Sequence, residues 1–409
     1  MNTSFAFSRP LYVMLKPAGA RCNLRCRYCY YLEKDHLYAG NDAHFMSERL
    51  LEKFIADYMQ AQTTPEVLFT WHGGEALLRP IAFYERALQL QRRYARGRQV
   101  VNSIQTNGTL LTPEWCEFLR ENGFLVGISI DGPRDVHDAY RRTSADGPSF
   151  DRVMQGLQLL KEHHVEWNAL AVVNNLNVEK PREFYRFFKD IGCQYLQFAP
   201  IVERIVSRDD GLTLAPGMQE GGRLTSHSIT PSQWGRFLCE LFDEWVVADV
   251  GSIFVQIFDA TLANWVGVTP GLCSLSAHCG HAAVMEHNGD VYSCDHFVYP
   301  EYRLGNLNEK TITEMVYSPQ QQRFAQMKTT MLPRQCRECQ FLFACHGECP
   351  KNRFLRDKYG NAGLNYLCEG YRQFFSHVTP HMNFMRRELQ AGRPPANIMQ
   401  ALNTINRNS

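Results

Sequence analysis

The sequence predicts an α/β fold, in which a parallel sheet forms an open, partial, TIM-like (β/α)6 barrel and a cysteine-rich C-terminal domain follows it. Two observations lead to this prediction. Short β-rich segments alternate with segments of helical periodicity through the first half of the chain, and such alternation builds a parallel sheet. The chain also has 14 cysteines among 409 residues, and eight of them lie between Cys273 and Cys368.

Six segments have the residue types of β-strands. They are LYVMLK (11–16), VLFTW (67–71), NSIQT (102–106), FLVGISI (124–130), WNALAVV (167–173) and YLQFAP (195–200). The segments between them carry apolar residues at three- and four-residue spacing, which predicts helices at 47–60, 83–95, 112–123, 149–164 and 181–192.

Polar and glycine-containing motifs follow several of these strands. They are HGGE (72–75), QTNG (105–108), DGP (131–133) and NN (174–175). In barrels of parallel strands the chemistry occurs at the carboxyl ends of the strands, so we expect the functional site there.

The rest of the chain divides by composition. Gly, Ser and charged residues from Glu203 to Trp234 indicate a loop, and a helix is expected at 232–248. We therefore predict four parts: the barrel (1–235), a linking helical segment (236–270), the cysteine-rich domain (271–370) and a helical tail (371–409).

Charge and composition exclude some classes of partner. The 43 basic and 42 acidic residues nearly cancel, so no overall field favours nucleic acid or an anionic membrane. No export signal is evident near the start, and no stretch approaches ~18 apolar residues. We expect a cytoplasmic protein with a small-molecule or peptide substrate. In that reducing compartment the cysteines indicate metal or redox chemistry rather than disulfides.

The first cysteine group lies in CNLRCRYC, where Cys22, Cys26 and Cys29 are separated by three and two residues. A structural zinc site needs four protein ligands, so this group would need a distant fourth ligand such as His36 or His44. A [4Fe–4S] cluster held by three thiolates instead leaves one iron open to another ligand.

CNLRCRYC after a first strand, with GGE after a second, resembles the radical SAM superfamily. The resemblance implies that the three cysteines bind a [4Fe–4S] cluster and that its open iron binds S-adenosylmethionine (SAM). It also implies further SAM contacts: Tyr28 near the adenine, the backbone of Gly73, Gly74 and Glu75 at the amino group, Ser129 and Arg141 at the ribose and carboxylate, and Val202 along the adenosine. Ser129 could instead cap a strand, Arg141 could be a surface charge and Val202 could be core. Ala76 stands where the family usually has proline, a mild departure for a backbone contact.

The eight downstream cysteines include CxxC followed by CxxxC in CRECQFLFACHGEC. Eight thiolates complete two four-ligand sites, and the residues alone leave zinc and iron–sulfur open. The pattern resembles the SPASM extension of radical SAM enzymes. The resemblance implies an interleaved ligand assignment: Cys273, Cys279, Cys294 and Cys349 for auxiliary cluster I, and Cys336, Cys339, Cys345 and Cys368 for auxiliary cluster II. We expect the remaining cysteines, Cys116, Cys193 and Cys239, to be core thiols.

From PLYVMLKP to LNYLC the chain resembles anaerobic sulfatase-maturating enzymes, particularly of the Bacteroides type. The resemblance implies oxidation of cysteine or serine in the C/S-x-P-x-R motif of a sulfatase polypeptide to Cα-formylglycine. It further implies SAM, three [4Fe–4S] clusters and an electron donor such as flavodoxin or ferredoxin. Asp295, directly after Cys294, is implied as the catalytic base, and Tyr31 as an aromatic near SAM. No role is assigned to His72, His281 or His296.

Two alternatives stay open at this point. A SPASM enzyme that crosslinks a ribosomal peptide often has an N-terminal peptide-binding domain, whereas only about ten residues precede the first expected strand here. A zinc-stabilised regulator would have no turnover. The client sulfatases, the choice between cysteine and serine, the oligomeric state and the electron donor are not determined by the sequence.

Overall fold

The centre of the fold is a ten-stranded sheet, and its six central strands are the predicted ones. The computed structural model describes residues 11–38, 45–279 and 282–408. The six strands are β1 (Tyr12–Leu15), β2 (Glu66–Trp71), β3 (Gln99–Thr106), β4 (Phe124–Ser129), β5 (Trp167–Val173) and β6 (Tyr195–Pro200). They pair side by side in chain order and all run parallel. The predicted parallel α/β sheet is therefore confirmed.

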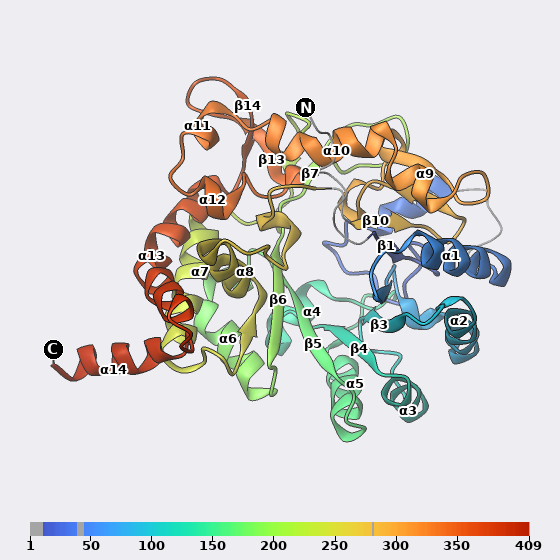
Figure 1. Cartoon of the computed structure of the whole chain (residues 1–409), viewed down its shortest axis with the longest axis horizontal. Helices are drawn as coiled ribbons and strands as arrows, with labels where there is room; N and C mark the ends of the chain where they lie inside the picture. The colour runs from blue at the N-terminus through green and yellow to red at the C-terminus, as the bar shows by residue number, and fades with distance from the viewer. Residues whose placement is uncertain (1–10, 39–44, 280–281, 409) are drawn as a thin grey trace.

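The predicted helices connect these strands and lie along the outer side of the curved sheet (Figure 1). They are α1 (Glu48–Ala61), α2 (Ile81–Tyr94), α3 (Pro113–Glu121), α5 (Phe150–Glu162) and α6 (Pro181–Asp190). Side chains of Ser47 and Thr112 cap α1 and α3 at their first turns. Among the α-helices between these six strands, α4 (Arg134–Tyr140) was not predicted, because it is too short to show an apolar repeat.

Four further strands extend the sheet at both edges, and none of them was predicted. β9 (Phe254–Val255) pairs with β6, and β10 (Ala282–Met285) pairs in parallel with β1. β11 (Asp290–Tyr292) and β12 (Arg303–Asn306) continue antiparallel from β10. Strands of two to four residues are too short for a periodic signal. The cysteine-rich region thus begins on the edge of the barrel sheet, and the domain boundaries at 235, 270 and 370 stay predictions.

The loop between β6 and α7, residues 201–230, contains a hairpin of two-residue strands within otherwise irregular chain. The remaining strands and helices are β7 (Arg204–Ile205), β8 (Arg223–Leu224), α7 (Pro231–Ala248), α8 (Gln256–Val266), α9 (Ile312–Val316), α10 (Pro319–Thr330), α11 (Arg334–Arg337), α12 (Leu342–Cys345), β13 (Arg353–Arg356), β14 (Ala362–Asn365), α13 (Cys368–Gln390) and α14 (Asn397–Asn408). Short 3-10 helices occur at Leu32–Tyr38, Ala76–Leu78, Asn177–Glu179, Cys273–Leu275, Asp295–Phe297, Pro300–Tyr302 and Pro350–Asn352.

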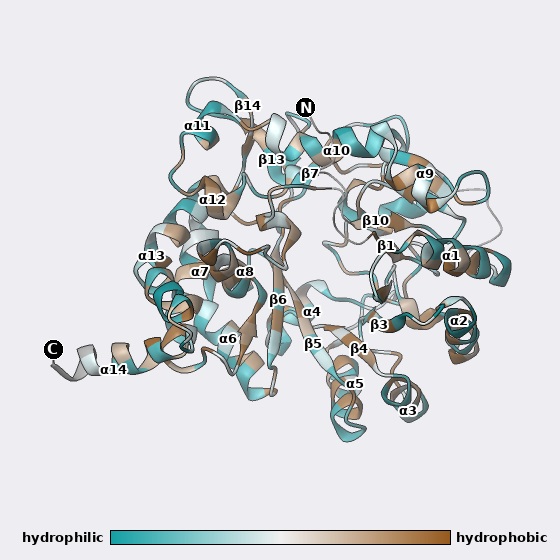
Figure 2. Ribbon diagram, viewed as in Figure 1, coloured by the Kyte–Doolittle hydropathy of each residue, from teal (hydrophilic) through white to brown (hydrophobic). Residues whose placement is uncertain are grey.

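The hydrophobic core lies between the sheet and its helices and continues between α7 and α13. Figure 2 shows hydrophobic stretches interrupted by hydrophilic residues on the central strands, and a mixture on the helices. Cys116, Cys193 and Cys239 are buried in this core, as expected for core thiols. In the part of the chain that the structure describes, none of the helices has the length and apolar character needed to cross a membrane.

Candidate active site

A cavity of about 210 Å³ lies at the carboxyl ends of the barrel strands. Its wall is formed by the loop after β1, by residues at or near the ends of β2 to β6, and by His296 and Lys351 from the cysteine-rich region. The lining includes most of the residues predicted for cluster and SAM binding: Cys22, Cys26, Cys29, Tyr28, Gly73, Gly74, Ser129 and Arg141. The fold thus brings together side chains from segments far apart in the sequence at the predicted rim.

The cysteine loop is fixed by backbone hydrogen bonds to the last residue of α4 and to the segment that follows it. Arg25 N donates to Arg142 O at 2.7 Å and Arg27 N donates to Tyr140 O at 2.9 Å. Burial is the main cause that raises the pKa of the Cys22 and Cys26 thiols to about 12; Glu75 adds to the rise at Cys22, whereas Arg141 opposes it at Cys26. A coordinating metal reverses this effect, since a ligating thiol is deprotonated. Three thiols on one loop, beside a cavity whose wall is mostly apolar and partly shielded from water, fit an open iron–sulfur cluster.

The GGE motif holds that loop in place. Gly74 N donates to Gly19 O at 2.7 Å and Glu75 N donates to Arg21 O at 2.8 Å. A Cβ on Gly74 would lie 2.0 Å from Arg21 O, so only glycine fits. These bonds occupy N–H groups of the motif. The amino group of a ligand is a donor, so the carbonyl oxygens of the motif are the backbone atoms that could accept from it.

The Glu75 side chain has a structural task. Its buried carboxylate accepts from Leu77 N at 2.9 Å, Thr106 Oγ1 at 2.7 Å and Asn107 N at 2.8 Å. These bonds tie the end of β2 to the end of β3. The carboxylate oxygens of Glu75 are thus engaged within the protein, and its predicted contact with SAM rests on its backbone.

Tyr28 and Arg141 share a partner that the sequence analysis did not identify. The Tyr28 hydroxyl donates to Asp131 Oδ2, and the Arg141 Nε lies 3.0 Å from the same oxygen. Asp131 Oδ1 accepts from Val172 N at 2.9 Å, which holds the carboxylate against β5. Burial alone would lower the pKa of Arg141, but Asp131 raises it above its usual value. Asp131 is the first residue of the DGP motif after β4, and this position at a strand end was the sequence signal that could have identified it.

The remaining candidate residues differ in how close they lie to this cavity. Ser129 lines the cavity and accepts from Gln105 Nε2 at 3.0 Å. Val202 is buried in the core, while its neighbours Ile201 and Glu203 line the cavity. His36, the alternative zinc ligand, lies against Gly211 in the β6–α7 loop. The other alternative, His44, lies outside the described residues, as does His281.

Asp295 lies next to this cavity, and a neighbouring side chain contacts each of its two carboxylate oxygens. Lys16 Nζ forms an ion pair with Oδ1, and the Tyr30 hydroxyl donates to Oδ2. Burial would raise the pKa of Asp295, but Lys16, and then His72 and His296, hold it below its usual range. The carboxylate is therefore ionised at neutral pH and has charged and neutral donors around it.

Two histidines on the cavity wall were given no role from the sequence. Gly73 N donates to His72 Nδ1 at 2.8 Å, which assigns the remaining ring proton to Nε2. Burial lowers the pKa of His72 to about 4, and burial followed by Lys351 lowers the pKa of His296 to about 4. Both imidazoles are thus neutral at pH 7. Their positions in the sequence could have indicated a place at the site, because His72 opens the HGGE motif and His296 lies two residues after Cys294.

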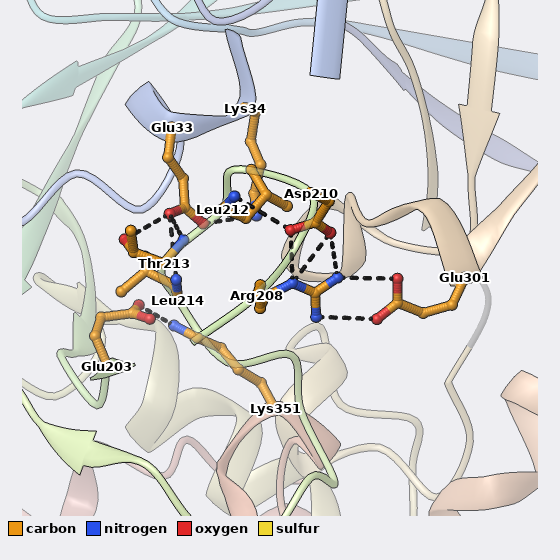
Figure 3. A network of polar contacts seen from close by, with 10 residues as sticks. All are labelled: Glu33, Lys34, Glu203, Arg208, Asp210, Leu212, Thr213, Leu214, Glu301 and Lys351. Carbon is orange, nitrogen blue, oxygen red and sulfur yellow. Dashed lines mark hydrogen bonds and ion pairs between the residues drawn. The ribbon is translucent and has the colours of Figure 1, made fainter. Parts of the chain in front are cut away.

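The β6–α7 loop closes one side of the site through a polar network (Figure 3). Glu33 Oε2 accepts from Thr213 N at 2.7 Å and from Thr213 Oγ1 at 2.9 Å. Arg208 donates to Asp210 and to Glu301. At the cavity itself, Glu203 pairs with Lys351. The network thereby joins the segment after the cysteine loop, the β6–α7 loop and the cysteine-rich region.

The eight downstream cysteines form two groups by their electrostatic neighbours. The Cys294 pKa is raised by burial and then by Cys349 and Cys273, and the Cys349 pKa is raised by burial and then by Glu348, Cys279 and Cys273. The Cys368 pKa is raised to about 12 by burial and then by Cys336 and Cys339, and Cys345 is near Cys368 and Cys336. The interleaved assignment would place these neighbours together, and it stays a prediction. No three His, Cys, Asp or Glu side chains among the described residues meet at a single metal-ion position.

The surroundings of each group of four cysteines fit a multi-iron cluster. Cys336, Cys339, Cys345 and Cys368 all line one cavity of about 610 Å³. Lys328, fully buried, donates to Cys273 O at 2.8 Å; burial raises the pKa of the Cys273 thiol, and Lys328 opposes that rise. Arg353, also buried, acts in the same way on Cys336. Buried cations of this kind offset the negative charge of thiolate ligands.

We expect Cys349→Ala to remove auxiliary cluster I and to leave auxiliary cluster II. Although Cys349 lies in the CRECQFLFACHGEC run, its thiol neighbours are Cys273 and Cys279. Iron analysis of the reconstituted variant should show a loss of about four irons, the content of one such cluster. Cys368→Ala is the matched variant and should remove the other centre. Mössbauer or EPR spectra in which Cys349→Ala loses the same centre as Cys368→Ala would contradict the interleaving.

Comparisons with known proteins agree with this geometry. Residues 17–188 match the model of the radical SAM superfamily, and residues 277–340 match SPASM, an iron–sulfur cluster-binding domain. A serine-type anaerobic sulfatase-maturating enzyme of Bacteroides thetaiotaomicron is 62% identical over 98% of this chain and 97% of its own. A cysteine-type enzyme of Clostridium perfringens is 30% identical over 91% of this chain and 97% of its own.

A solved structure is similar over nearly the whole chain. The structure of native anSMEcpe with bound AdoMet and Cp18Cys peptide has a TM-score of 0.82 and 28% identity. The match covers 93% of this chain and 100% of that chain.

Proposed function

Because this chain belongs to the anaerobic sulfatase-maturating enzymes of the radical SAM superfamily, we propose that it oxidises a residue of a sulfatase polypeptide to Cα-formylglycine. The observation that carries the proposal is the single cavity that unites the cysteine loop, the glycine motif, Ser129 and Arg141, with Asp295 beside it. The proposal includes a cytoplasmic location and an electron donor such as flavodoxin or ferredoxin.

Three groups of cysteines bind three [4Fe–4S] clusters in this proposal. Cys22, Cys26 and Cys29 hold the cluster with the open iron, and the two downstream groups hold the auxiliary clusters. Arg141 and Ser129 orient SAM from one side of the cavity, and the Gly73 and Gly74 carbonyl oxygens accept from its amino group. When bound, SAM and the open cluster supply a carbon radical that removes a hydrogen atom from Cβ of the target residue.

Asp295 performs the acid–base part of the reaction. A serine side chain becomes an aldehyde when its Cβ loses one hydrogen atom, its hydroxyl loses one proton and the remaining unpaired electron leaves. Asp295 takes the hydroxyl proton, and Cys273, Cys279, Cys294 and Cys349 place an electron acceptor next to that base. With a cysteine target the same losses give a thioaldehyde, which water converts to the aldehyde with release of hydrogen sulfide.

We further propose serine as the target residue. The relative with 62% identity is a serine-type enzyme, whereas the cysteine-type relative has 30% identity. The test is anaerobic incubation of the reconstituted protein with SAM, a reductant and one of two matched peptides, containing S-x-P-x-R or C-x-P-x-R. Mass spectrometry should show that the serine peptide loses two hydrogens, and a peptide with alanine at the target should stay unchanged.

Three outcomes would contradict the proposal. Conversion of the cysteine peptide alone would refute the serine assignment. A crosslinked peptide product would favour the other kind of SPASM enzyme. A colourless preparation that contains zinc and little iron would favour the non-catalytic alternative, because iron–sulfur clusters make a protein brown.

A further inference from the structure

We propose that Lys16 and Tyr30 are positioning residues that together clamp the Asp295 carboxylate beside the cavity, one contact on each oxygen. The inference rests on the proposed function, because it assigns a task to the surroundings of the proposed base. Its evidence is the set of contacts around Asp295, which come from two different elements of the barrel.

Lys16 approaches Asp295 from the end of β1. Its backbone N–H donates to Met285 O at 2.9 Å, so the main chain is fixed to β10 at this point. Its side chain is 1% exposed, and its ammonium group contacts Asp295 Oδ1 and lies 3.1 Å from the centre of the Tyr31 ring. An ammonium group buried to this extent needs an anionic or aromatic partner, and Lys16 has both.

Tyr31 and Glu286 hold Lys16 from behind. The Tyr31 ring is buried under the ammonium group, and its hydroxyl donates to Glu286 Oε1. Glu286 is fully buried, and its backbone N–H donates to Asp290 O at 2.9 Å. The aromatic residue expected near SAM thus supports Lys16, and Lys16 cannot move away from Asp295 without disturbing this second layer.

Tyr30 reaches the other carboxylate oxygen from the cysteine loop. Its hydroxyl donates to Asp295 Oδ2. Its ring lies 5.4 Å from the His296 ring and 5.8 Å from the Tyr31 ring, at 84° to the latter, and Lys351 Nζ lies 5.3 Å from its centre. Aromatic contacts on several sides fix the direction in which the hydroxyl points.

The clamp leaves Asp295 able to act. A carboxylate has about four lone-pair positions on its two oxygens, and Lys16 and Tyr30 take one on each oxygen. The two contacts together oppose rotation about the Cβ–Cγ bond, and the remaining positions are those that a substrate hydroxyl would use. The orientation of the carboxylate matters because a misplacement of a catalytic group by about 1 Å can lower the reaction rate by about 10²-fold.

The experiment compares Tyr30→Phe, which removes one oxygen atom, with Lys16→Met and Lys16→Arg. Formylglycine and 5′-deoxyadenosine are measured in the same anaerobic reaction. We expect deoxyadenosine within about twofold of the parent, and formylglycine per deoxyadenosine lower by about 10- to 100-fold in Tyr30→Phe and Lys16→Met. Lys16→Arg keeps the positive charge and should recover part of the loss. Tyr38→Phe removes a hydroxyl whose partner is Tyr292, outside the site, and should match the parent.

A structural readout makes the test independent of turnover. A crystal structure of Tyr30→Phe should show the Asp295 carboxylate rotated relative to the parent, with Lys16 still in contact. If formylglycine per deoxyadenosine in both Tyr30→Phe and Lys16→Met equals that of the parent, the clamp is overturned. A parallel loss of formylglycine, deoxyadenosine and iron would overturn it as well. If the parent itself makes no formylglycine, the proposed function fails, and the Asp295 orientation in the two crystal structures still decides the clamp.

Discussion

Simultaneous replacement of Cys22, Cys26 and Cys29 by alanine should abolish SAM cleavage. These thiols lie on one loop and line the cavity together with Gly73 and Gly74. Within residues 11–38, 45–279 and 282–408 no other cysteine lines that cavity, so the proposed downstream clusters should not take over the task. Iron should fall from about 12 to about eight atoms per chain, since one of the three proposed four-iron clusters would be lost. Iron analysis and chromatographic measurement of 5′-deoxyadenosine check both parts.

The matched control for the triple variant is Cys239→Ala. Cys239 is a core thiol in α7, so its loss should leave both the iron content and SAM cleavage at the parent level. A triple variant that keeps the parent's iron and still produces deoxyadenosine would show that the open cluster is bound elsewhere.

Asp295→Asn should separate the radical step from the proton transfer. The amide keeps the size of the side chain but not its basicity, and loss of a general base typically costs ~10²–10⁴-fold. Formylglycine should therefore fall by at least about 10²-fold, while deoxyadenosine still forms. Asparagine also leaves the buried Lys16 without its anionic partner, so iron content must be measured alongside.

A capping role for Asp295 predicts a different result. Asparagine caps a turn nearly as well as aspartate, so product would hardly change. In the structure the Asp295 carboxylate contacts Lys16 and Tyr30. Asp135→Asn is the control, because Asp135 is exposed on α4. Parent-like formylglycine in Asp295→Asn would remove Asp295 from the catalytic residues, and equal loss of both products would make it a residue of cluster or SAM binding.

The local features of this protein could be predicted from its sequence. Strand and helix periodicity is a property of neighbouring residues, which is why all six central strands and five of their helices were predicted near their observed bounds. The spacing in CNLRCRYC is equally local, and it identifies three thiols on one loop without any knowledge of the fold. Strands as short as β9 to β12 were missed because two to four residues carry no measurable period.

The contacts that organise the site were decided only by the tertiary structure. Tyr30 and Asp295 are 265 residues apart in the chain, and Tyr28 and Asp131 are 103 residues apart. No periodicity or motif connects such positions, because their meeting depends on the pairing of β10 with β1 and on the order of the barrel strands. Burial then sets the chemistry: the resemblance implied a role for Asp295 but none for Lys16, and only exclusion from water makes each need the other.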